Sequence, residues 1–404
     1  MGRGEADVDL HRNPAPRSAT HGPSSSVYTR LLHGYKGFAI AEPSERGITL
    51  AQLRHTFECA LERCALERWT STNPRNVGQP LVLETITLYD LVSNFIVPAT
   101  GGGRRALVEL LASEPQPPVW FVSHWWAEPV HLFIRCLEQH AMDHMLGDDS
   151  PYWVCAYANR QSQAELALEL PVDALLSETP FFKAIKLSDG VVSIVDPESR
   201  AFTRAWCAFE LWTALEGGTR HDIYTTIGGR EREGAGGVQA VGLVDGFAEI
   251  DLHYAHGKKE DAGYYKSYRE KDFPIERAHR VLLVTVADAE ASVEADRLRI
   301  MASITEPSEL DAMLRARFGA AVIERVLGSD EPGAEGVFRQ YGEAFAGSRR
   351  LRRVTAQMDI EPAEARCALL SQSLPLGLAE LTLASIYGPA AYAAAVAGAG
   401  AGAL

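Results

Sequence analysis

The sequence predicts an α/β fold built on a doubly wound parallel sheet, flanked by helical N- and C-terminal regions. Short apolar runs alternate with helical patterns four times along the middle of the chain, which is typical of such sheets. We expect strands at 119–122, 152–158, 191–195 and 222–227, and helices at 130–141, 181–187 and 202–215. The first expected strand ends abruptly in polar and aromatic residues, as strands do at the binding crevice of an open α/β sheet.

The N-terminal third lacks this alternation. Residues 1–45 are rich in Arg, Pro, Ser and Gly without periodicity, and we expect a disordered leader. Apolar residues recur at three- and four-residue steps from position 50, which predicts a helical N-terminal extension over 46–115. Within it, residues 81–87 could form a strand or lead into a helix at 88–96.

The C-terminal part is predicted to be mainly helical. We expect the α/β domain to span 116–290, with a further edge strand at 247–251, followed by a helical region over 291–350. The leucines at 374, 378, 381 and 383 are compatible with a single leucine-rich repeat or a helical cap, within a last segment at 351–404 that ends in Ala and Gly. The glycine-rich run at 228–237 lacks a following Lys-Ser/Thr and is expected to be a loop rather than a phosphate cradle.

Composition narrows the range of functions. The chain has 404 residues and a net charge of −14, which argues against binding to nucleic acid or to anionic membranes. It shows no secretion signal or membrane-spanning run, and we expect a cytoplasmic protein. The six cysteines are scattered without a C-x-x-C pair, which predicts buried thiols, no disulfide framework and no metal site.

Polar and aromatic residues gather where the first two expected strands end. Ser123, His124, Trp125 and Trp126 follow the first strand, and Asn159 and Gln161 follow the second. Carboxyl ends of parallel strands meet at one edge of the sheet, and ligands bind there. These residues are therefore candidates for substrate binding, with the tryptophans as a stacking surface. Each also has an ordinary structural explanation in a core or a turn.

Glu210 is the candidate for chemistry. On a helix its neighbours include Trp206, Cys207 and Thr213, so that its carboxylate lies on a mostly apolar side. Such a group is either desolvated, which raises its pKa, or neutralised by a cation. Arg204 and Lys183 are the expected cations in the second case, and the sequence leaves both alternatives open.

A nucleophilic hydrolase is the weakest alternative. Ser123 and His124 are adjacent on a strand, and adjacent strand residues point to opposite faces, which opposes a Ser-His pair. Cys155 and Cys207 are more simply explained as small buried hydrophobic residues than as nucleophiles.

Three stretches resemble Toll/interleukin-1 receptor (TIR) domains and their relatives, the heterokaryon-incompatibility domains. The first is Phe121-Val-Ser-His-Trp-Trp-Ala-Glu-Pro-Val-His-Leu-Phe133, which is similar to the first strand and loop of TIR domains. The second is Val192-Ser-Ile-Val195 followed by Arg204-Ala-Trp-Cys-Ala-Phe-Glu-Leu211, which is similar to their third strand and W-C-x-x-E-L helix. The third, Trp153-Val-Cys-Ala-Tyr-Ala-Asn-Arg-Gln161, resembles a strand of heterokaryon-incompatibility domains. The series of motifs as a whole also resembles a group of proteins from dinoflagellates and other microalgae.

The resemblance implies a flavodoxin-like sheet and a signalling function. In enzymatic TIR domains the glutamate of the W-C-x-x-E-L helix cleaves NAD between nicotinamide and ribose, and this role falls on Glu210. Ser123, His124, Trp125, Trp126, Asn159, Gln161 and Trp206 would then line the substrate pocket. NAD would be a substrate and not a resident cofactor. The alternative is a non-catalytic interaction module that works by self-association, with protein partners on the C-terminal region or the tyrosine-rich segment at 264–268.

Overall fold

A six-stranded mixed sheet forms the centre of the molecule. The structure, a computed structural model, describes residues 24–171, 174–228, 238–274 and 284–311, positions 277, 280, 281, 314 and 318, and two strands at 353–358 and 380–385. The strand order is β1-β3-β2-β4-β5-β6. The strands are β1 (Ile48–Thr49), β2 (Trp120–Ser123), β3 (Pro151–Trp153), β4 (Gly190–Ile194), β5 (Arg220–Ile227) and β6 (Gln239–Leu243). The four central strands are parallel and the two edge strands antiparallel, so the α/β class is confirmed and the all-parallel sheet is wrong at both edges.

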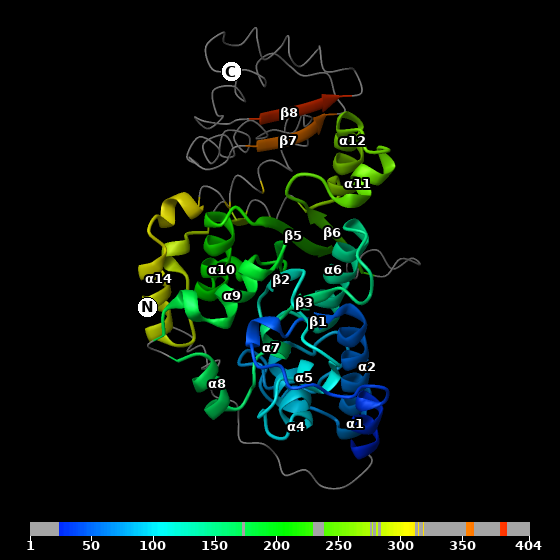
Figure 1. The fold of residues 1–404 in the computed structure, drawn as a ribbon, viewed down its shortest axis with the longest axis vertical. Coiled ribbons are helices and arrows are strands. Elements are labelled where there is room, and N and C mark those ends of the chain that lie inside the picture. The colour runs from blue at the N-terminus through cyan, green and yellow to red at the C-terminus, as the bar shows by residue number, and fades with distance from the viewer. Residues whose placement is uncertain are drawn as a thin grey trace.

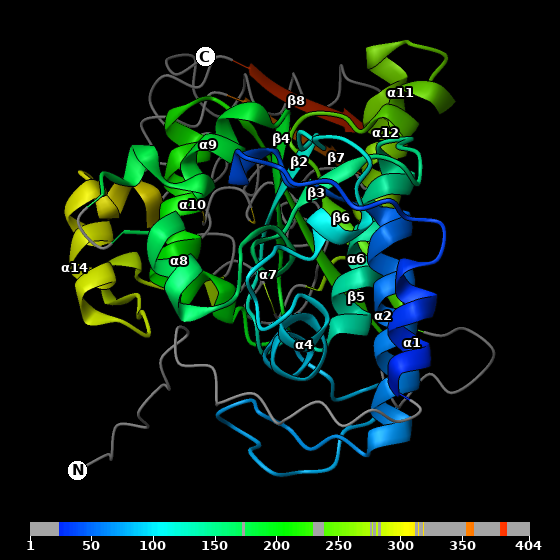
Figure 2. The same ribbon diagram turned by 60° about the horizontal axis from the view of Figure 1, so that its bottom comes forward.

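Helices cover both faces of the sheet, as Figures 1 and 2 show. The helices nearest to it are α2 (Leu50–Glu67), α6 (Val130–Asp143), α9 (Pro180–Leu187) and α10 (Ala205–Glu216). Trp120 and Val122 of β2 belong to the core shared with α2 and α6, while Phe121 between them packs against α9. This alternation of side chains is what a strand buried on both faces requires.

The remaining elements surround this core. They are α1 (Ser24–Leu32), η1 (Pro43–Glu45), α3 (Leu88–Leu91), η2 (Val92–Ile96), α4 (Val97–Ala99), α5 (Val108–Leu111), α7 (Cys155–Ala158), α8 (Gln163–Glu169), η3 (Leu176–Glu178), η4 (Arg200–Thr203), α11 (Glu249–Tyr254), α12 (Lys259–Glu270), η5 (Val286–Asp288) and α14 (Glu294–Ser303). Strands β7 (Arg353–Met358) and β8 (Glu380–Ser385) pair in parallel as a second sheet. None of the helices in the described part of the chain is long and apolar enough to cross a lipid bilayer.

Three expectations about individual elements need correction. The expected strand at 152–158 is the short strand β3 followed by the helical turn α7, because a short apolar run suits both states and the alanines favour a helix. The expected edge strand at 247–251 is the start of α11, where the Asp251 carboxylate accepts a hydrogen bond from Ala248 N. The edge strand is β6 instead.

The N-terminal segment also departs from expectation. Residues 24–45 contain α1 and η1 rather than disorder alone, because Val27 and Leu31 of α1 are buried in the core with α2. The extension at 46–115 is helical as expected, but it also supplies β1 to the main sheet. Residues 81–87 form no strand, and Thr87 instead caps α3, where its hydroxyl donates to Asp90.

Several expectations fall partly or wholly outside the described residues. These are the leader over 1–23, most of the glycine-rich run, and most of the helical region expected over 291–350. Of the four leucines read as a repeat, 381 and 383 lie in β8 and the other two are not described. The expected boundaries at 290, 350 and 351 stay predictions.

A buried ion network holds the segment that leads into the candidate site. The Arg46 guanidinium donates to Ala158 O at 3.2 Å and to the Glu169 carboxylate at 2.6 Å. Arg160 donates to both oxygens of Glu109, and the neighbouring guanidiniums hold the pKa of Glu109 below its usual value despite burial. The network therefore fixes the residues directly after α7 against the N-terminal extension.

Replacing Arg46 by Met should destabilise the fold. The change leaves the Glu169 carboxylate buried without its shortest ion pair, and breaking a buried pair costs about 3–5 kcal/mol. Arg54→Met is the matched control, because Arg54 pairs with Asp148 at the surface, where such pairs contribute about 0–1 kcal/mol. Urea unfolding of both variants measures the difference, and equal losses for the two would contradict the prediction.

Candidate functional site

A pocket lies beside the carboxyl ends of the central strands, between the loop after β2, the segment after α7 and helix α10. It comprises about 800 Å³ of space, part of which is open solvent. Its lining residues are Tyr89, His124, Trp125, Trp126, Cys155, Asn159, Gln161, Leu166, Leu170, Phe181, Arg204, Trp206, Cys207, Glu210 and Glu290. All the predicted site residues except Ser123 line this pocket.

Glu210 lies in the wall of the pocket and is only 5% exposed. Ser123 Oγ, at the end of β2, donates a hydrogen bond to Glu210 Oε2 at 2.5 Å. Burial raises the pKa of Glu210 to about 8, and the hydrogen bond from Ser123 only partly opposes this effect. Ser123 therefore takes part in the site through Glu210.

No cation in the described part of the chain neutralises Glu210. Arg204 donates to Ser292 Oγ at 3.2 Å and Lys183 is exposed, so neither forms the ion pair that the sequence left open. A carboxylate that is buried beside a cavity without a counter-ion is costly to the fold. Ionisable groups with strongly shifted pKa values are concentrated at functional sites, where catalysis or binding requires them.

His124 does not act as a partner of Ser123. Its ring packs against Phe133, with ring centres 4.9 Å apart, and its Nδ1 lies 3.4 Å from Val122 O. Burial lowers the pKa of His124 to about 4, so the ring is neutral near pH 7. Within the described structure its Nε2 has no hydrogen-bond partner. The expectation that adjacent strand residues face apart is thus confirmed, and a Ser-His nucleophile pair is absent from these two residues.

The aromatic residues form much of the pocket wall. Trp126 Nε1 donates to Cys155 Sγ at 3.2 Å, and its ring meets the edge of Tyr89. Trp206 stacks on Phe181 with ring centres 4.9 Å apart. These rings leave apolar surface on the pocket side, which suits a planar ligand.

Two cations lie close to the ring of Trp125. The guanidinium carbons of Arg75 and Arg200 are 4.8 Å and 5.5 Å from the centre of its ring. All three residues also line a second, more polar hollow that shares Trp125, Tyr89, Arg204 and Glu290 with the pocket. The two cavities therefore adjoin, and the second one brings positive charge to the first.

Asn159 and Gln161 reach the pocket from the loop after α7. Gln161 Nε2 donates to Ala156 O at 3.0 Å and stiffens the loop. Asn159 is buried, and its Oδ1 has no hydrogen-bond partner among the described residues. This oxygen is therefore an acceptor that a ligand could satisfy.

The two thiols of the pocket are poor nucleophiles. Burial, together with the negative charge of Glu210, raises the pKa of Cys155 to about 12 and that of Cys207 further. Nucleophilic attack requires the thiolate. Both cysteines are free, as are Cys59, Cys64 and Cys136, so no disulfide joins the described cysteines.

Sequence reasoning missed several lining residues. Tyr89 comes from the N-terminal extension, Phe181 from α9, and Glu290 from a segment that pairs with Arg204 through an isolated bridge. Contacts between segments so distant along the chain leave no local pattern in the sequence. Glu128, in the loop after β2, was also unexpected: burial raises its pKa to about 8, with a smaller effect from Asp196. It does not line the pocket.

Replacing Glu210 by Gln should change how stability depends on pH. The folded carboxyl group titrates at about pH 8 and an unfolded one near about 4.3, so the folded state binds more protons between these values. Glu210 therefore makes the wild type lose stability as pH rises through this window, and the variant lacks this contribution. We expect the stability of the variant relative to the wild type to increase by up to about 1.4 kcal/mol per pH unit.

Urea unfolding at several pH values measures this effect. Glu216→Gln is the control on the same helix, because Glu216 is exposed. Glu128 and His124 titrate in the wild type and in both variants. Their effect on the free energy of unfolding therefore cancels when each variant is compared with the wild type. If the Glu210→Gln difference stayed constant between about pH 5 and 8, the carboxylate would not be desolvated as described.

In comparisons with protein-family models, curated proteins and solved structures, nothing matched this chain.

Proposed function

We propose that the central domain is TIR-like, with a sheet that varies the flavodoxin-like arrangement. Numbered along the chain, the four parallel strands have the spatial order 2-1-3-4, which is the beginning of the flavodoxin-like order. The pocket lies where ligands bind in such sheets, beside the point at which the strand order reverses. The antiparallel edges β1 and β6 would be additions to this arrangement.

We further propose that the protein cleaves NAD at the bond between nicotinamide and ribose. The observation that carries this proposal is the Glu210 carboxylate, buried at an open pocket with Ser123 as hydrogen-bond donor and not paired with a cation among the described residues. A positively charged reacting centre would supply the missing counter-charge. Carboxylates stabilise the oxocarbenium-like centre of glycoside cleavage in this way.

The reaction needs no redox partner. The bond between ribose C1′ and the pyridinium nitrogen breaks, and its electron pair neutralises the nicotinamide ring. Glu210 stabilises the positive charge that develops on the ribose. Water then adds to C1′ and releases a proton, so the products are nicotinamide and ADP-ribose.

The rest of the pocket fits a dinucleotide. Trp126, Tyr89 and Trp206 offer apolar ring surfaces for a planar base, and Asn159 Oδ1 offers an acceptor for an amide or a ribose hydroxyl. The adjoining hollow holds Arg75 and Arg200, and guanidiniums are suited to phosphate groups. A ligand that carries a base, a ribose and phosphates would therefore use both cavities.

A second candidate is a non-catalytic module that self-associates and binds proteins through the C-terminal region or the tyrosine-rich segment. Its support is an exposed group of tyrosines on α11 and α12: Tyr254, Tyr264 and Tyr268. Tyrosines of this kind are enriched at protein interfaces. This function predicts oligomers whose size grows with protein concentration and does not change in Glu210→Gln, which light scattering can measure.

Glu210→Gln should abolish the release of nicotinamide from NAD. Glutamine keeps the size of the side chain but cannot carry the negative charge, and loss of such a charge costs roughly 10²–10⁴-fold in rate. The measurement follows nicotinamide and ADP-ribose with purified full-length protein at high concentration, where self-association would be favoured. Glu216→Gln should retain wild-type activity. An inactive wild type under these conditions would rule out the enzyme, and equal rates for wild type and Glu210→Gln would rule out this role of Glu210.

The pH dependence of the reaction should follow the ionisation of Glu210. Since the carboxylate is the active form, kcat/KM should rise with pH and level off above about pH 8. The pyridinium charge of bound NAD favours the carboxylate, so kcat should level off at a lower pH than kcat/KM. Steady-state rates across this range test both statements, and a kcat/KM that falls as pH approaches 8 would contradict them.

A further inference from the structure

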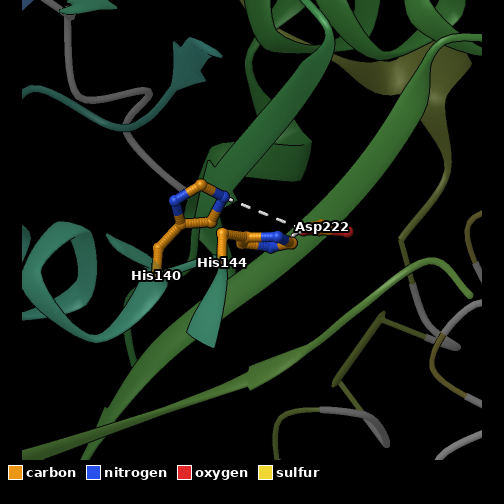
Figure 3. Close-up of side chains that lie close together, drawn as sticks. All are labelled: His140, His144 and Asp222. Carbon is orange, nitrogen blue, oxygen red and sulfur yellow. Dashed lines mark hydrogen bonds and ion pairs between the residues drawn. The ribbon is translucent and has the colours of Figure 1, made fainter. Parts of the chain in front are cut away.

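A second cluster of titratable side chains lies at the amino edge of the sheet, away from the pocket. Helix α6 begins after the tryptophan-bearing loop and runs back along the sheet, so its last turn lies near the beginning of β5. His140 and His144 are four residues apart on this turn, on one face of the helix. Asp222 is near the start of β5. Figure 3 shows the two imidazole rings beside Asp222.

The geometry of this cluster matches a metal site. His140 Nε2 lies 3.8 Å from Asp222 Oδ2, and His144 Nε2 lies 2.6 Å from the same oxygen. The three ligand atoms are all within 4.8 Å of one another. Two ligand atoms of a tetrahedral zinc ion, each about 2.0–2.1 Å from the metal, are about 3.3 Å apart. This value lies between the distances of the two histidine nitrogens from Asp222 Oδ2.

One ligand atom in the cluster is left without a partner. His140 is fully buried, and its Nε2 has no hydrogen-bond partner among the described residues. A buried ring nitrogen that is directed toward a carboxylate but not bonded to it requires an explanation. A bound cation between His140, His144 and Asp222 would satisfy this nitrogen.

The surrounding hydrogen bonds are those that orient metal ligands. His140 Nδ1 lies 3.0 Å from Tyr152 OH, and His144 Nδ1 is hydrogen bonded to the Glu249 carboxylate. Metal-binding histidines commonly use their second nitrogen in this manner, which fixes the ring and its tautomer. Asp222 Oδ1 accepts from Asp245 N at 2.8 Å, and Oδ2 is hydrogen bonded to His144 Nε2, a contact that a bound metal would replace by coordinating both atoms.

We propose that His140, His144 and Asp222 bind one divalent transition-metal ion, and that Zn²⁺ is the best match to this ligand set. Imidazole and carboxylate are ordinary zinc ligands, and three protein ligands leave the fourth position to water. The expectation of no metal site considered cysteine pairs, whereas this site uses a His-x-x-x-His pair and an aspartate from a distant strand. The ion would join α6 to β5 and, through Glu249, to α11, and would bind as the protein folds.

Metal content of the full-length protein tests the proposal. Protein stripped with a chelator is loaded with Zn²⁺, passed over a desalting column and analysed by elemental mass spectrometry. We expect one zinc ion per chain and a rise in Tm with zinc. His140→Phe, which keeps a ring against Trp120, should lose both effects. His253→Phe is the control, because His253 is exposed on α11, and it should behave as the wild type.

Glu249→Gln provides a variant that retains all three ligands. It weakens the outer hydrogen bond to His144 and the partly exposed ion pair between Glu249 and Arg220. Loss of such an outer hydrogen bond lowers metal affinity by about 10–100-fold. Competition with a chromophoric chelator measures this affinity even if His140→Phe fails to fold. A wild type that retains no stoichiometric zinc would overturn the proposal. So would zinc affinity in Glu249→Gln equal to that of the wild type, because these outer contacts carry the assignment.

Discussion

The desolvation of Glu210 is the constraint on which the pocket depends. A carboxylate in this position is unfavourable for folding, and its Ser123 partner only partly offsets the cost. The carboxylate can remain there only because β2 and α10 are held firmly in the core and cannot turn it toward water. Parallel pairing of β2 with β3 and β4, and helices on both faces of the sheet, provide that rigidity. The favourable packing of the sheet therefore offsets the unfavourable burial of Glu210.

Buried polar groups lie at both the carboxyl edge and the amino edge of the sheet. The carboxyl edge carries the pocket, where a negative group lacks a counter-charge. The amino edge carries His140, His144 and Asp222, where the polar groups bond to one another and to Tyr152 and Glu249. Helix α6 links these edges, because it begins after the loop of Trp125 and ends in the turn that holds His144. A cation bound at the end of α6 would hold the whole helix in place. Because the tryptophan loop directly precedes α6, it would be held as well.

Much of this arrangement was predictable from local patterns. Strands β2, β4 and β5 and helices α6 and α10 follow from apolar runs and periodicity, because both faces of the sheet are covered. The run at 152–158 was misread, since buried strands and buried helical turns look alike over so few residues. Strand β1 is too short to produce a pattern. The residues that follow strands were predicted to line a pocket, and all of them except Ser123 do so, whereas Tyr89, Phe181 and Glu290 reach it through tertiary packing alone. The direction in which the Glu210 carboxylate points, and the lack of an ion pair to it within the described part of the chain, likewise depend on packing.

The composition of the pocket favours charge stabilisation over nucleophilic attack. Cys155 and Cys207 are placed to react, but the same burial that raises the pKa of Glu210 raises theirs, and the charge of Glu210 adds to the effect. Ionisation of Glu210 therefore makes either thiolate harder to form. The Cys207 thiol donates to the backbone oxygen of His124 and not to its ring. The neutral ring is hydrogen bonded to neither thiol and supplies no base for them. A substrate with a positive charge would lower the pKa of Glu210, because it stabilises the carboxylate directly. The two thiols would stay protonated. One carboxylate can thus act in a pocket where two cysteines do not.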